Sequence, residues 1–78
     1  MPGIEKSGNA THDAAVLASE KTLQAAIAGS PTQATINTAY VAHFNTVAAS
    51  ALTNGLLSQA AYYEAARKSL AARGSASP

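Results

Sequence analysis

The fold is decided by the stretch PTQATINTAYVAHFNTVAASALT, which spans residues 31–53. Its larger apolar side chains recur at spacings of four, four, three and four residues, which is the period of one face of an α-helix. They are Ile36, Tyr40, Phe44, Val47 and Ala51. The pattern predicts a helix over residues 31–53 with a single apolar stripe.

The residues at the start of this stretch mark a helix boundary. Gly29 suits the left-handed position after a helix, Ser30 suits an N-cap, and Pro31 suits a first helical position. Gln33 completes a capping box with the serine. We therefore expect one helix to begin at Asn9 or Thr11 and end at Ala28, and the next to start directly after it.

A second boundary follows at Gly55, which suits the position after the end of a helix. A third helix is expected from Leu56 or Ser58 to Arg73, since Leu56, Tyr63 and Leu70 recur every seven residues. We expect a three-helix domain over residues 9–73, a flexible N-terminus over residues 1–8 and a flexible tail over residues 74–78.

The composition is typical of a helical protein with a small hydrophobic core. Alanine supplies 20 of the 78 residues, whereas Leu, Ile, Val and Phe together supply only 13, and no cysteine is present to form a disulfide. A chain of this length has room for one small core. The predicted class is therefore all-α, a three-helix hairpin or bundle completed by oligomerisation or by docking on another protein.

The distribution of charge is unusual. No Asp, Glu, Lys or Arg occurs in the 42 residues between Lys21 and Glu64. The solvent face of the second helix would then carry small uncharged groups, namely Thr32, Thr35, Thr38, His43, Asn45, Thr46 and Ser50. Small uncharged side chains allow close helix packing, which favours contact on more than one face. The simpler interpretation is a neutral face in solvent, and the many polar groups argue against a membrane span.

The predicted interface with another chain consists of the apolar stripe and its neighbouring histidine. Its residues are Ile36, Tyr40, His43, Phe44, Val47 and Ala51. The expected partner is a second copy of the chain or a larger protein assembly. A net charge of +1 gives no long-range attraction for nucleic acid or an anionic membrane. The N-terminus lacks the apolar run of a signal peptide, so we expect a cytoplasmic protein.

No catalytic, cofactor or metal site is predicted. His12 and Asp13 are adjacent, so on a helix their side chains diverge by about 100° and do not form an oriented dyad. His12 and His43 alone do not supply the three or four ligands of a zinc site. Serine is plentiful, so a serine–histidine approach would be incidental. We expect a protein that is not an enzyme, and no internal repeat is evident.

One candidate ligand site remains near the end of the third helix. Tyr62, Arg67 and Lys68 combine an aromatic ring with basic groups, which could stack a base and hold a phosphate. The other interpretation is that basic groups near a helix C-terminus complement the helix dipole.

Three segments carry a resemblance to a class of known proteins. HDAAVLASE at residues 12–20, NTAY at 37–40 and AASALTN at 48–54 resemble short Ala-rich proteins encoded by tailed bacteriophages and prophages. The resemblance implies a small virion component, capsid-associated or accessory, that acts through helix packing. The alternative that it implies is a phage-encoded protein that sequesters a nucleotide-type ligand or inhibits a host factor. The resemblance does not assign a functional role to any residue of this chain.

Overall fold

The computed structural model describes residues 8–76, which form three α-helices. Helix α1 spans Ala10–Ala26, α2 spans Gln33–Thr53 and α3 spans Leu57–Ala76. No strand occurs within residues 8–76, and the predicted all-α class with three helices is confirmed. The N-terminal segment predicted to be flexible lies, apart from Gly8, outside the described residues.

Helix α1 begins where a polar side chain caps it. Asn9 has extended backbone angles, and its side-chain oxygen accepts a hydrogen bond from the backbone N–H of His12 at 2.9 Å. The helix ends at Ala26, two residues before the predicted end, because the backbone leaves the helical conformation at Ile27. Gly29 has a φ of 85°, the positive value predicted for it, two residues beyond this C-cap.

The predicted start of α2 was wrong. Thr32 is the N-cap in place of Ser30, and its hydroxyl accepts a hydrogen bond from the backbone N–H of Thr35 at 3.1 Å. Pro31 therefore precedes the cap and is not the first helical residue. Gln33 takes that position, so the predicted capping box does not form, and its side-chain amide donates to Asn37 at 2.9 Å instead.

The turn between α2 and α3 is a Schellman motif. Gly55 has a φ of 75°, and its N–H donates to the carbonyl of Leu52 at 3.1 Å. The N–H of Leu56 donates to the carbonyl of Ala51 at 2.8 Å. These two bonds satisfy carbonyls that the helix end would otherwise leave free. The prediction that Gly55 follows the end of the second helix is confirmed.

Helix α3 continues past the predicted end at Arg73. Residues 74–76, predicted to belong to a flexible tail, are helical, while residues 77–78 lie outside the described part of the chain. A single glycine such as Gly74 lowers helix stability by about 1 kcal/mol relative to alanine and does not by itself end a helix.

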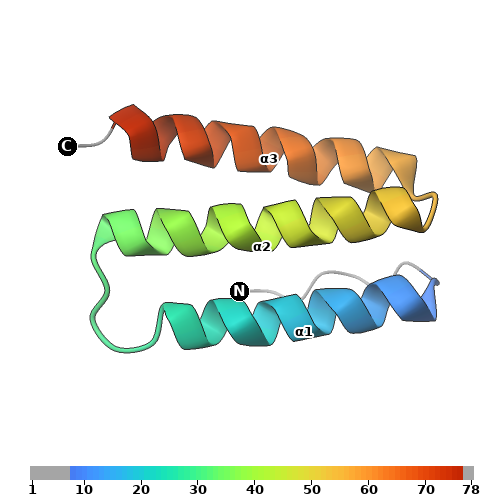
Figure 1. Cartoon of the computed structure of the whole chain (residues 1–78), viewed down its shortest axis with the longest axis horizontal. Helices are drawn as coiled ribbons and strands as arrows, with labels where there is room; N and C mark the ends of the chain where they lie inside the picture. Colours follow the sequence, from blue (N-terminus) through green and yellow to red (C-terminus); the bar gives the residue numbers. More distant parts are fainter. Residues whose placement is uncertain (1–7, 77–78) are drawn as a thin grey trace.

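The three helices lie side by side in one layer, with α2 between α1 and α3 (Figure 1). Helix α2 runs antiparallel to both neighbours. Within the described residues, no Cα atom of α1 lies within 8 Å of one of α3. The molecule measures 39 × 24 × 17 Å.

The core is as thin as the composition predicts. Its buried apolar side chains are Val16, Leu23, Val47, Ala48 and Ala51. All five lie on α1 or α2, and none of the described side chains of α3 is fully buried. Helix α3 therefore packs closely against α2 without a fully buried side chain of its own among those described, and the fully buried side chains lie on α1 and α2.

Candidate functional site

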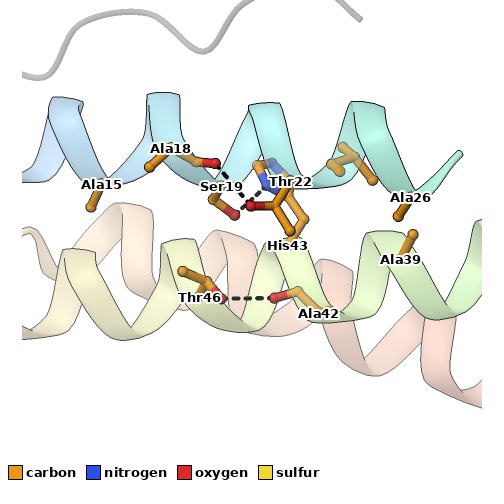
Figure 2. A pocket seen from close by; sticks show the side chains of 10 residues that line it. Ala15, Ala18, Ser19, Thr22, Ala26, Ala39, Ala42, His43 and Thr46 are labelled. Carbon is orange, nitrogen blue, oxygen red and sulfur yellow. Dashed lines mark hydrogen bonds between the residues drawn. The ribbon is translucent and has the colours of Figure 1, made fainter. Parts of the chain in front are cut away.

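Two buried histidines cross the seam between α1 and α2. The Nδ1 atom of His43 on α2 lies 2.8 Å from the Oγ atom of Ser19 on α1 (Figure 2). In the reverse direction, Nδ1 of His12 on α1 lies 2.9 Å from Oγ of Ser50 on α2. Each helix thus contributes one histidine and one serine, and the two pairs are reciprocal.

The reciprocal pairing reflects a repeat that sequence analysis missed. The pattern H-x-x-x-V-x-x-S occurs as His12, Val16 and Ser19 on α1 and again at residues 43, 47 and 50 on α2. Two antiparallel helices that carry the same pattern meet with each histidine opposite the other helix's serine. The seven-residue spacing of histidine and serine, shared by both helices, was the signal that could have predicted it.

Burial sets the electrostatics of this seam. His12 and His43 are 1% and 3% exposed, and the Nε2 atom of each is buried without a hydrogen-bond partner in the described part of the chain. Desolvation lowers the pKa of His43, although the charge of Glu20 and a hydrogen bond to the backbone of Ser19 partly oppose this effect. The seam therefore favours neutral imidazole at position 43.

The predicted positions of two polar residues on α2 were wrong. His43 and Ser50 were expected on the solvent face, but His43 is buried and Ser50 is half-buried, and both bond to side chains of α1. The uncharged region of the chain is thus partly explained by packing within the chain itself. The expectation that α2 is contacted on more than one face is met by α1 and α3.

The solvent-exposed side of α2 is a separate stripe, here called the outer stripe. Its six side chains are all exposed and recur at spacings of three and four residues: Thr35, Thr38, Ala42, Asn45, Ala49 and Leu52. Three of them, Thr35, Thr38 and Asn45, were among those predicted to face solvent. None of the six side chains is ionic. Packing within the chain therefore does not explain the lack of charge in this stripe.

Grooves lie on both sides of the outer stripe. The groove between α1 and α2 has a volume of about 400 Å³ and is lined mainly by alanines, which Figure 2 shows on both helices. Thr22 and Thr46 also line it, but each hydroxyl donates to a backbone carbonyl of its own helix, at 3.2 and 3.0 Å. This groove therefore offers small, largely apolar contacts.

The groove between α2 and α3 has a volume of about 480 Å³. Leu52 and Leu57, which are 63% and 66% exposed, both line it. A leucine that keeps most of its surface in water forgoes most of the 1.5–3 kcal/mol that full burial contributes. Two such residues at one groove form an exposed apolar patch on the same side as the outer stripe.

The predicted interface residues divide into two groups. His43, Val47 and Ala51 are buried within the single chain. Ile36, Tyr40 and Phe44 are half-buried, and the ring of Phe44 contacts Tyr63 on α3. The contact of these six residues with another chain stays a prediction, but three of them have no surface left to offer without rearrangement.

An aromatic row joins α2 to α3. The ring of Phe44 stacks on that of Tyr63 with centroids 5.8 Å apart, and Tyr40 lies 6.0 Å from Phe44. Tyr62 meets Tyr63 edge-on at 5.1 Å. Burial raises the pKa of Tyr63, and the neighbouring Tyr62 and Glu20 act in the same direction. Phe44 thus has a role inside the chain, holding α3 against α2.

The candidate ligand residues do not converge on a cavity. Tyr62 is 61% exposed and Lys68 is exposed, while Arg67 forms an ion pair with Glu64 one turn earlier on α3. The hydrogen bond with Arg67 lowers the pKa of Glu64. The guanidinium is therefore engaged by a carboxylate.

Comparisons with known proteins identify no relative of this chain. No family model, no curated protein and no solved structure matches the chain. None of the helices in residues 8–76 is long and apolar enough to cross a membrane. No group of three or more His, Cys, Asp or Glu residues that could hold a metal ion occurs within the same residues.

Proposed function

We propose that this chain is a non-catalytic helical assembly protein that acts by associating with itself or with a larger protein assembly. The observation that carries the proposal is the open side of α2. On this side the outer stripe, which has no ionic side chain, lies between two grooves, and Leu52 and Leu57 are each more than 60% exposed. Exposed apolar surface of this kind is typical of protein–protein contact.

A catalytic role has less support from the polar groups of the seam. Ser19 lines the groove between α1 and α2, but it is only 8% exposed, so its hydroxyl has little access to a substrate. Neither histidine has a carboxylate at its second ring nitrogen to orient it, as a serine–histidine nucleophile would need. The two pairs are better suited to fixing the register of α1 against α2.

The nucleotide-binding alternative also has less support. A phosphate would compete with Glu64 for the guanidinium of Arg67, and the side chain of Tyr62 lines neither groove. In keeping with the resemblance to phage-encoded proteins, we propose a virion-associated structural component as the specific assembly role. Detection of the chain by mass spectrometry in purified particles of a phage that encodes it would test that role.

The assembly proposal itself is tested by light scattering after size exclusion. Purified chain at about 100 μM should give a mass of two or more chains per particle, since weak non-obligate contacts have micromolar dissociation constants. A particle of one chain, which also captures no component of a purified virion, would contradict the proposal.

A further inference from the structure

We infer that α1 is an acid-sensitive arm, which leaves α2 when His43 takes up a proton while α2 and α3 stay packed together. This behaviour belongs to the single chain, so it goes beyond the proposed assembly role and does not depend on it. Two features of the structure support it, namely the way in which α1 is attached and the surroundings of the buried imidazoles.

Among the three helices, the backbone of α1 approaches only that of α2. Within the described residues, no Cα atom of α1 lies within 8 Å of one of α3, and residues 27–32 link α1 to α2 outside any helix (Figure 1). Helix α3 packs along α2 and is joined to it by the short turn at Gly55. Helix α1 can therefore turn away at its linker without displacing α3 from α2.

The seam between α1 and α2 suits a neutral imidazole and not a charged one. His43 is 3% exposed, and its Nδ1 atom lies 2.8 Å from Oγ of Ser19. A protonated ring carries a hydrogen on each nitrogen, and Nε2 of His43 is buried with no hydrogen-bond partner in the described part of the chain. The charge would thus be desolvated with one N–H group unpaired, whereas water satisfies both N–H groups once α1 has left α2.

His12 repeats this arrangement further along the seam. Its Nδ1 atom lies 2.9 Å from Oγ of Ser50, and its Nε2 atom is likewise buried without a partner among residues 8–76. Each of the two histidine–serine bonds joins α1 to α2, so both break when α1 turns away. We therefore expect the helix to leave as a unit.

The charge that acts on His43 comes from α1. Burial lowers the pKa of His43, and the half-buried Glu20 and a hydrogen bond to the backbone of Ser19 oppose this effect only in part. Helix α2 has no ionic side chain. On α3, burial raises the pKa of Tyr63, which is linked to His43 through the ring of Phe44, so this tyrosine stays neutral in acid. The other titratable side chains described on the helices are His12, Asp13 and Lys21 on α1, Tyr40 on α2, and Tyr62, Glu64, Arg67 and Lys68 on α3.

Hydrogen exchange followed by mass spectrometry tests the arm. The full chain is measured at about pH 7.5 and 5.5, one unit either side of the ordinary histidine value, and each rate is divided by that of an unfolded peptide at the same pH. The protection of α1 should fall about three- to tenfold, since a single imidazole that stays neutral in the seam gives at most about tenfold over this range. The protection of α3 should change by less than about twofold. Equal falls in all three helices, or an unchanged protection of α1, would overturn the inference.

Three variants test whether His43 is the group that takes up the proton. Glu20→Gln removes the charge that favours the proton on His43, so the acid loss of α1 protection should be larger than in the wild type. Glu64→Gln is the matched control, because it makes the same change on α3, where the carboxylate bonds to Arg67. His43→Gln should remove most of the loss. A loss that persists in folded His43→Gln, or that is the same in Glu20→Gln and Glu64→Gln, would overturn the inference.

Discussion

At the residue scale, the histidine–serine pairs define this protein. Each pair places a polar group inside a thin core and satisfies only one ring nitrogen of the imidazole. A buried polar group that loses its partner costs more than an exposed one, because water cannot replace the lost bond. The two serines differ in this respect, since Ser19 is buried and Ser50 is half-buried.

The difference between the serines predicts unequal effects of the same substitution. Ser19→Ala should lower the free energy of unfolding by about 1–3 kcal/mol, since Nδ1 of His43 would remain buried without a partner. Ser50→Ala also leaves a buried Nδ1 atom, that of His12, without its partner, but Ser50 itself is half-buried, so water can occupy the space of its hydroxyl and the cost should be smaller, about 1 kcal/mol. Urea denaturation followed by circular dichroism measures both, and a larger loss for Ser50→Ala would contradict the explanation.

The same seam predicts a dependence of stability on pH. Burial holds the pKa of His43 in the folded chain below its ordinary value of 6.5, so the unfolded chain takes up the proton first as the pH falls. The contribution of neutral His43 is fully present above about pH 7 and is lost progressively as the pH falls through 6.5 toward the lowered pKa.

Denaturation curves between pH 7.5 and 5.5 (about one unit either side of the ordinary histidine value) would measure this loss. His43→Gln should flatten the dependence of the unfolding free energy on pH in that range. A wild-type stability that stays constant over the range, or a variant with an unchanged slope, would show that His43 does not carry the effect.

At the element scale, the helices differ in how firmly they are held. Helices α1 and α2 share both histidine pairs and carry all the fully buried side chains among the described residues, whereas α3 contributes none, although its backbone lies close to that of α2. The ring of Tyr63 on α3 stacks on that of Phe44 on α2. Elements with few buried contacts open at lower free energy than the rest of a fold.

This contrast predicts that Phe44→Ala loosens α3 selectively. Hydrogen exchange followed by mass spectrometry should show about tenfold or faster exchange in α3 of the variant, with much smaller changes in α1, because the seam remains closed. Tyr62→Ala is the control, since its ring is 61% exposed and does not contact α2 through a ring pair. Equal acceleration in all three helices would indicate instead that the fold opens as one unit.

At the scale of the whole molecule, α1 and α3 cover α2 on two sides, and the outer stripe on a third side is exposed. If copies associate through this open side, assembly adds to stability by mass action. The midpoint of thermal unfolding should therefore rise as the chain is concentrated from about 2 to 200 μM, by several degrees for a domain of this size. Ala49→Glu, which places a charge in the outer stripe, should show a smaller rise, and a midpoint independent of concentration for the wild type would contradict self-association.

The number and rough extent of the helices could be predicted from local sequence. The apolar spacing of residues 31–53 and the turn at Gly55 depend on local geometry, so they could be read directly from neighbouring residues. The choice of Thr32 over Ser30 as the N-cap could not be predicted in this way, because both residues suit the position and only the path of the linker decides between them.

Which uncharged residues are buried depends on the packing of the helices and could not be predicted from local sequence. His43 and Asn45 are two positions apart on one uncharged helix, yet one is buried against Ser19 and the other is exposed beside Leu52. The lack of charge does not distinguish the two residues, since a histidine or an asparagine suits a packed seam as well as an open surface. The distinction depends on where α1 and α3 lie against α2, because burial is a property of the contacts between helices and not of the sequence of any one of them.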